Sequence, residues 1–135
     1  MPPRSRTAAV AAVAALLTIV PASAARAVPE NPEPARGELF LTVSDAKGTW
    51  TRGVLLICPD QGDGPHPRAA AACTDIERAG GELRALSGRQ SNCTNEHRPV
   101  VAEAEGTWRD SRLHWRTEFP NVCVLVRRTG AVFDF

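Results

Sequence analysis

The chain has 135 residues, with 16 Lys or Arg residues against 15 Asp or Glu residues, so its formal net charge is +1. This length is enough for one domain, and the even charge balance argues against a nucleic-acid partner, because nucleic acids usually bind a basic stripe. The sequence holds four cysteines, whose chemistry depends on the compartment in which the protein works.

The first 27 residues have the pattern of a secretory signal peptide. Arg4 and Arg6 form a positively charged head, and the apolar run over 8–20 that follows is shorter than the roughly 20 residues that span a membrane. Ala-x-Ala patterns at 22–24 and 25–27 are two candidate cleavage sites. A membrane anchor is the alternative interpretation. We predict that 1–27 is removed and that the protein is secreted, extracellular and without contact to a membrane.

Cleavage after Ala27 would remove three arginines and no acidic residue, which leaves 13 basic residues against 15 acidic ones. The mature chain then carries a net charge near −2, which again gives no basis for binding nucleic acid. Residues 28–36 contain three prolines and no periodic pattern, so we predict a flexible lead-in there. A single domain is expected over 37–135.

All four cysteines lie in the exported part of the chain: Cys58, Cys73, Cys93 and Cys123. Because an exported chain meets an oxidising environment, an even number of cysteines predicts two disulfides, each worth ~2–4 kcal/mol. A zinc site is the alternative, but the separations of 15, 20 and 30 residues include no Cys-x-x-Cys pair. We therefore predict two disulfides, with three possible pairings, and neither a metal nor another cofactor.

Two segments in the first half of the domain are predicted to pair as an antiparallel hairpin. Residues 37–44 alternate between apolar and polar, with Leu39, Leu41 and Val43 on one face, which is typical of a half-buried strand. After a short turn, residues 53–58 form an apolar run of strand length.

A helix is predicted over 68–79. This segment is rich in alanine, follows Pro67 and stops at Gly80-Gly81, which are the usual signals for the start and the end of a helix. Its apolar face would hold Ala69, Ala72, Cys73 and Ile76.

The second half of the domain predicts another hairpin and a short helix. Residues 100–108 and 112–119 both alternate and are joined by a short link, as in an antiparallel hairpin. Pro120 opens a predicted helix over 120–128, and residues 132–135 are predicted as a last strand. Strands at both ends around one longer helix predict an α+β domain with an antiparallel sheet.

Candidate catalytic groups are scattered along the chain. His66 lies between two prolines, and His114 lies on the outer face of a predicted strand. A Ser-His-Asp combination can be drawn from loop residues, but no nucleophile-elbow, metal or phosphate-binding motif supports one. We therefore predict that the protein is not an enzyme and works by binding, with catalysis through His66 or His114 as the alternative.

The segment 87–99 is predicted to be a long exposed loop, because it has no apolar side chain that could be buried except Cys93. A disulfide at Cys93 would pin the loop upstream of Asn95 and Glu96, and Pro99 would stiffen it downstream. A standard-mechanism protease inhibitor needs such a loop, since its ordering cost is met during folding rather than at binding. An ordinary surface loop tied down for stability is the alternative.

A set of short segments along the domain carries a family resemblance. These segments are 41–43, 58–59, 64–67, 71–75, 80–83, 93–100, 106–108, 119–123 and 129–135. In their order and spacing, with all four cysteines in place, they resemble the Streptomyces subtilisin inhibitor family of secreted actinobacterial protease inhibitors. Each segment alone is weak evidence, whereas the whole set is specific.

The resemblance implies a fold, a partner and a site. It implies the pairings Cys58–Cys73 and Cys93–Cys123, a five-stranded antiparallel sheet with two helices, and a homodimer formed through the sheet. It implies reversible inhibition of subtilisin-like serine proteases, and sometimes of trypsin. The reactive bond would be Asn95–Glu96, with Asn95 at position P1, the residue before the bond. The rest of the binding loop would be Asn92, Cys93, Thr94, His97 and Arg98.

Two residues depart from the pattern of that family. Family members often carry Lys, Arg or Met at P1 and an aromatic residue two positions after the bond, where this chain has Asn95 and His97. Neutral Asn95 cannot pair with the aspartate in the S1 pocket of trypsin, so we expect subtilisin rather than trypsin as the target. A secreted binding module on the same fold that has lost inhibition is the alternative function.

Overall fold

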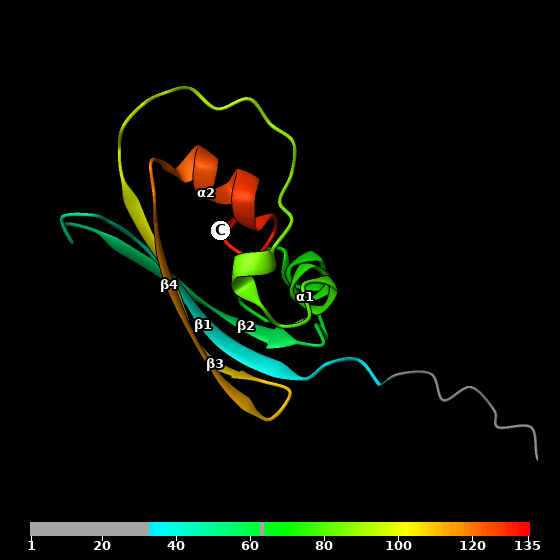
Figure 1. Ribbon diagram of the computed structural model, residues 1–135. Helices are drawn as coiled ribbons and strands as arrows, with labels where there is room; N and C mark the ends of the chain where they lie inside the picture. The colour runs from blue at the N-terminus through cyan, green and yellow to red at the C-terminus, as the bar shows by residue number, and fades with distance from the viewer. Residues whose placement is uncertain (1–32, 63) are drawn as a thin grey trace, which may run out of the picture. The chain divides into compact units, whose positions relative to one another are not determined.

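The computed structural model describes residues 33–62 and 64–135, so the predicted signal peptide lies outside the described residues. The elements are β1 (Gly37–Asp45), β2 (Thr51–Cys58), α1 (Ala69–Arg78), the short 3₁₀ helix η1 (Leu83–Ala85), β3 (Val100–Trp108), β4 (Ser111–Phe119) and α2 (Val122–Thr129). The helices lie together on one face of the sheet (Figure 1). No helix in the described part of the chain is long and apolar enough to cross a membrane.

Both predicted hairpins are confirmed. β1 pairs with β2 with Gly37 opposite Cys58, and β3 pairs with β4 with Val100 opposite Phe119. β1 also pairs antiparallel with β3, so the two hairpins join into one sheet with the strand order β2-β1-β3-β4. The predicted strand bounds agree with the observed ones to within two residues.

The alternation in β1 builds the core beneath the helices. Leu39, Leu41 and Val43 are buried, as predicted, and Leu41 lies opposite the small Ala104 of β3. Because successive side chains of a strand point to opposite faces, Phe40 lies on the outer face of the sheet and is 53% exposed.

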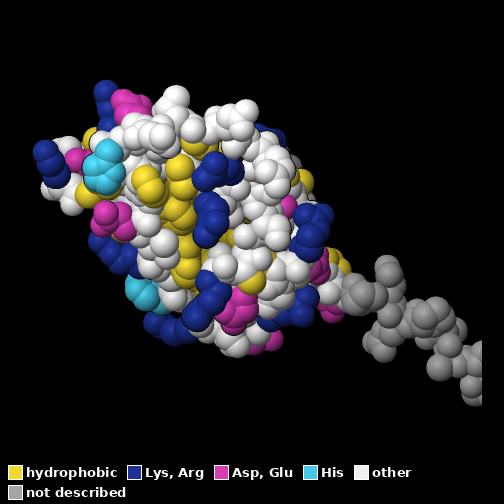
Figure 2. Space-filling model, turned by 45° about the horizontal axis from the view of Figure 1, so that its top comes forward, with side chains coloured by type: hydrophobic (Ala, Val, Ile, Leu, Met, Phe, Trp, Pro, Cys, Tyr) yellow, Lys and Arg dark blue, Asp and Glu magenta, His cyan; other side chains and the backbone are white. Residues whose placement is uncertain are grey.

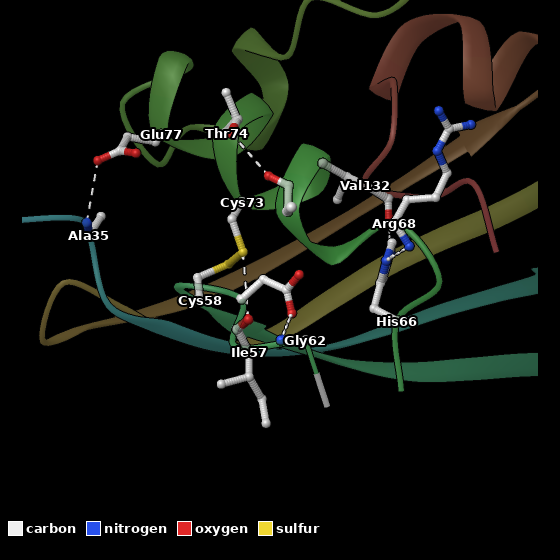
Figure 3. Close-up of a disulfide and its surroundings, with 12 residues drawn as sticks. Ala35, Ile57, Cys58, Gly62, His66, Arg68, Cys73, Thr74, Glu77 and Val132 are labelled. Atoms are coloured by element: carbon white, nitrogen blue, oxygen red, sulfur yellow. Dashed lines mark hydrogen bonds between the residues drawn. A yellow bond between two sulfur atoms is a disulfide. The ribbon is translucent and has the colours of Figure 1, made fainter. Parts of the chain in front are cut away.

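The predicted first helix is confirmed as α1, within one residue at each end. Its apolar face is buried, and Gly80 takes the positive φ of 67° that commonly follows the last helical turn. The disulfide Cys58–Cys73 joins the end of β2 to the middle of α1, which confirms the implied pairing (Figure 3). This disulfide ties the helix to the sheet.

The predicted fifth strand is wrong, because the sheet of the described residues has four strands and the chain after α2 forms a turn. Val132 and Phe133 are buried in the core, so the apolar pattern did predict burial. Side chains, however, bind two backbone groups of this segment: Ala131 N donates to Asp75 Oδ2 at 3.0 Å, and Val132 O lies 3.0 Å from His66 Nε2. A short apolar run whose polar groups find such partners needs no strand ladder.

Candidate functional site

The predicted loop is a stretch without helix or strand that leaves η1, arches over α2 and enters β3 (Figure 1). Its central residues are exposed, apart from the half-buried Cys93: Asn92, Thr94, Asn95, Glu96, His97 and Arg98. On the face that carries the loop and α2, a strip of hydrophobic side chains is open to solvent and bordered by Lys or Arg side chains (Figure 2). The candidate residues are therefore accessible to a partner.

Upstream, the loop is fastened by the disulfide Cys93–Cys123, with the two Cα atoms 5.7 Å apart. This is the second implied pairing, and it is confirmed. Cys123 is the second residue of α2, so the disulfide ties the loop to the first turn of that helix.

At the centre of the loop, the side chain of Asn121 holds the backbone on both sides of Asn95. Its Nδ2 donates to Glu96 O at 2.7 Å and more weakly to Thr94 O at 3.4 Å. Its Oδ1 accepts from Val124 N at 2.9 Å, which caps the N-terminus of α2. Asn121 is 7% exposed, so one buried amide connects the helix cap to the loop.

Downstream, two backbone hydrogen bonds and an ion pair hold the loop where it approaches β3. Arg98 N donates to Pro120 O at 2.9 Å, and Pro99 O accepts from Ala46 N at 3.0 Å. Arg98 also pairs with Glu96 at 2.8 Å, although exposed pairs of this kind contribute little. The loop is thus anchored before, at and after Asn95, mostly by the short segment 120–123.

The turn that supplies Ala46 is itself ordered by Asp45. Asp45 Oδ2 accepts from Thr49 Oγ1 at 2.6 Å and Oδ1 accepts from Trp50 N at 3.0 Å. These two hydrogen bonds, the first above all, hold the pKa of the Asp45 carboxyl below its usual value. The stability that they contribute is present above the unfolded pKa of an aspartate and is lost as the pH falls through the lowered folded pKa.

The histidines considered for catalysis are not brought together. His66 is buried, with Nε2 donating to Val132 O and Nδ1 accepting from Arg68 N at 3.0 Å, so both ring nitrogens hold the fold (Figure 3). His114 lies on the outer face of the sheet opposite Glu105. Neither geometry is that of a general base with an adjacent nucleophile.

Sequence reasoning missed Asn121, which was taken as part of a helix that begins at Pro120. The local signal was present, because Asn is a preferred N-cap residue and an apolar segment follows it. The contacts of its amide with Thr94 and Glu96 span 27 and 25 residues, and no sequence pattern predicts them.

Comparison with known proteins identifies the family. The family model described as subtilisin inhibitor-like matches residues 35–121. Subtilisin inhibitor-like protein 2 of Streptomyces rochei is 41% identical over 72% of this chain and 90% of its own length, and the protease inhibitor SIL-V1/SIL-V4 of Streptomyces netropsis is 36% identical over 72% and 94%. Both relatives are named as inhibitors and not as enzymes.

Comparison with a solved structure also indicates this family. The crystal structure of Streptomyces caespitosus sermetstatin in complex with Bacillus licheniformis subtilisin contains a chain that superposes with a TM-score of 0.59 at 27% identity. The match covers 74% of this chain and 99% of that chain. On these matches and on the anchored loop, the chain belongs to the subtilisin inhibitor-like family.

Proposed function

We propose that this protein is a secreted inhibitor of subtilisin-like serine proteases and that Asn95–Glu96 is its reactive bond. The observation that carries the proposal is the bracing of Thr94 O and Glu96 O by Asn121. These carbonyls stand on either side of Asn95, so the peptide between them is presented in one conformation. Family membership and the names of the relatives support inhibition rather than catalysis by this chain.

The anchors favour tight binding because they remove an entropic cost. Ordering the backbone of one residue costs ~1–2 kcal/mol. In this loop, the disulfide at Cys93, the amide of Asn121 and the hydrogen bond from Arg98 N to Pro120 O order the segment already in the free protein. Binding to a protease therefore leaves more of the contact energy as affinity.

The same anchors favour resynthesis after cleavage. The serine of the protease would attack the Asn95 carbonyl carbon and pass its proton to the protease histidine, which returns it to the Glu96 nitrogen as the peptide bond breaks. The new Glu96 amine would stay beside the acyl carbon, because Asn121 holds Glu96 O and Pro120 holds Arg98 N. Attack by this amine reforms the bond and returns the serine to its starting state, in competition with water.

The direct test is a titration of active subtilisin with the purified mature protein. Stoichiometric loss of activity, together with a slow cleavage product that ends at Asn95, is the expected result. Full protease activity at micromolar excess of the protein would contradict the proposal.

The identity of P1 gives a sharper prediction. Asn95→Lys is expected to create inhibition of trypsin, because the new ammonium can pair with the aspartate of the trypsin S1 pocket. A charge-assisted hydrogen bond of ~1.5–3 kcal/mol corresponds to a gain of about 10- to 150-fold in affinity. Asn95→Gln, which lengthens the side chain without a charge, is the matched control and is expected to leave trypsin active. If the Lys variant also leaves trypsin untouched, Asn95 is not P1.

We also propose a homodimer through the outer face of the sheet. Phe40 of β1 and Ile57 of β2 lie there and are 53% and 42% exposed, and the half-buried Leu55 lies opposite Phe40. An apolar centre of this kind is typical of an interface between identical chains. Phe40→Glu is expected to convert the sedimentation behaviour from dimer to monomer without changing the inhibition of subtilisin. A wild-type chain that sediments as a monomer at high concentration would refute the dimer.

A further inference from the structure

A groove of about 760 Å³ opens between the β1–β2 turn and the part of the loop that follows Asn95. Two large exposed hydrophobic residues line it: Trp50, which is 39% exposed, and Val122, which is 38% exposed. The other two large exposed hydrophobic residues of the described chain, Phe40 and Ile57, lie on the outer face of the sheet. The groove is therefore an apolar surface that is separate from the outer face of the sheet.

The walls of the groove are held in place without a ligand. The turn is closed by the hydrogen bonds of Asp45 with Thr49 and Trp50, and Ala46 N donates a hydrogen bond to Pro99 O. The guanidinium of Arg52 lies 5.6 Å from the Trp50 ring centre, which further restricts the indole. A partner would meet a preformed surface, and little ordering would be needed on binding.

The position of the groove points to its occupant. One wall is formed by Glu96, His97, Arg98 and Pro99, the residues that follow the proposed reactive bond. When a protease holds Asn95–Glu96 in its cleft, the residues after the bond lie on the side of the cleft that binds the product amine. The rim of the protease on that side must then lie against this wall. The groove is thus continuous with the proposed inhibitory interface.

The charges of the groove define the chemistry of that rim. Lys47 and Asp45 line the groove from the turn, and Arg98 and Glu96 line it from the loop. Arg98 is paired with Glu96 at 2.8 Å, and the carboxylate of Asp45 accepts hydrogen bonds from Thr49 and Trp50. The ammonium of Lys47 is therefore the charge that the turn offers to a partner. An apolar side chain beside a carboxylate would complement Trp50, Val122 and Lys47.

We propose that this groove is a second docking site for the bound protease, which inserts an apolar side chain from the rim of its cleft and faces Lys47 with a carboxylate. The inference rests on the proposed function, because the rim reaches the groove only when the loop occupies the cleft. It assigns to Trp50 a role in affinity that is independent of the P1 residue.

The test compares Trp50→Ala with Phe40→Ala in the inhibition of Bacillus licheniformis subtilisin. Trp50→Ala is expected to raise Ki at least about tenfold, mainly through faster dissociation, as truncation of a buried aromatic anchor does. Phe40→Ala removes a more exposed aromatic residue from a different face and is expected to leave Ki unchanged. Thermal unfolding of both variants verifies that the fold is retained.

A second variant tests the role of the positive charge of Lys47. Lys47→Glu is expected to slow association at low salt, with the difference from wild type shrinking as salt is raised. A wild-type chain that does not inhibit subtilisin overturns the proposed function and this inference together. A wild-type chain that inhibits, with unchanged Ki for Trp50→Ala and unchanged association for Lys47→Glu, overturns the docking site alone. A change in self-association without a change in Ki assigns the groove to a second copy of the chain and also overturns it.

Discussion

Asn121→Ser is expected to make the protein a weaker inhibitor that the protease hydrolyses faster than the wild type, while α2 stays capped. Ser and Asn are comparable N-cap residues, so the serine hydroxyl can accept from Val124 N as the Asn121 side chain does. The serine side chain is shorter and has no amide with which to bind Glu96 O and Thr94 O. The 2.7 Å hydrogen bond to Glu96 O is worth ~0.5–1.5 kcal/mol, so its loss alone corresponds to a rise in Ki of about 2- to 13-fold.

The measurements are Ki, the rate of cleavage at Asn95–Glu96 by mass spectrometry, and the melting temperature. Asn121→Ala is the matched control, because it removes the cap as well as the contacts with the loop. We expect the same rise in Ki for both variants, and a further loss of ~0.5–2 kcal/mol of stability for the alanine variant alone. If Asn121→Ser inhibits like wild type and is not cleaved faster, the amide does not hold the loop.

Removal of the Cys93–Cys123 disulfide is expected to reduce inhibition more than removal of Cys58–Cys73. In the double variant Cys93→Ser with Cys123→Ser, the part of the loop before Asn95 keeps only the long 3.4 Å contact between Asn121 and Thr94 O. This contact is too weak to order that part of the loop alone. Ordering two more residues on binding costs ~2–4 kcal/mol, which corresponds to a rise in Ki of about 30- to 1,000-fold.

The double variant Cys58→Ser with Cys73→Ser is the control for this comparison. This disulfide joins Cys58 at the end of β2 to Cys73 of α1, and both residues lie outside the loop. Its removal is expected to cost ~2–4 kcal/mol of stability and to leave Ki unchanged at temperatures where the variant is folded. Both pairs are measured for Ki and for denaturant unfolding. Equal effects on Ki would show that the loop depends on overall stability and not on its own anchor.

Much of the fold was predictable because its signals are local. The alternation in β1, β3 and β4 places one side of each strand in the core, and a period of two is visible in a few residues. The Gly80-Gly81 stop of α1 is likewise read from adjacent residues, because positive φ values favour glycine. The failure was the predicted strand at 132–135, where an apolar pattern shows burial but does not show which groups satisfy the backbone.

By itself, the sequence determined the four strands of the sheet, the first helix, the exposed loop around Asn95 and, through its resemblance, the family and the pairing of the two disulfides. Only the tertiary structure showed that Asn121 braces the loop, that His66 serves the fold, and that Trp50 and Val122 meet in one groove. Periodicity and turn signals act between neighbours in the chain and leave a pattern in it. Contacts such as that between Asn121 and Glu96 join residues far apart in sequence, and they exist only once the sheet and helices have brought those residues together.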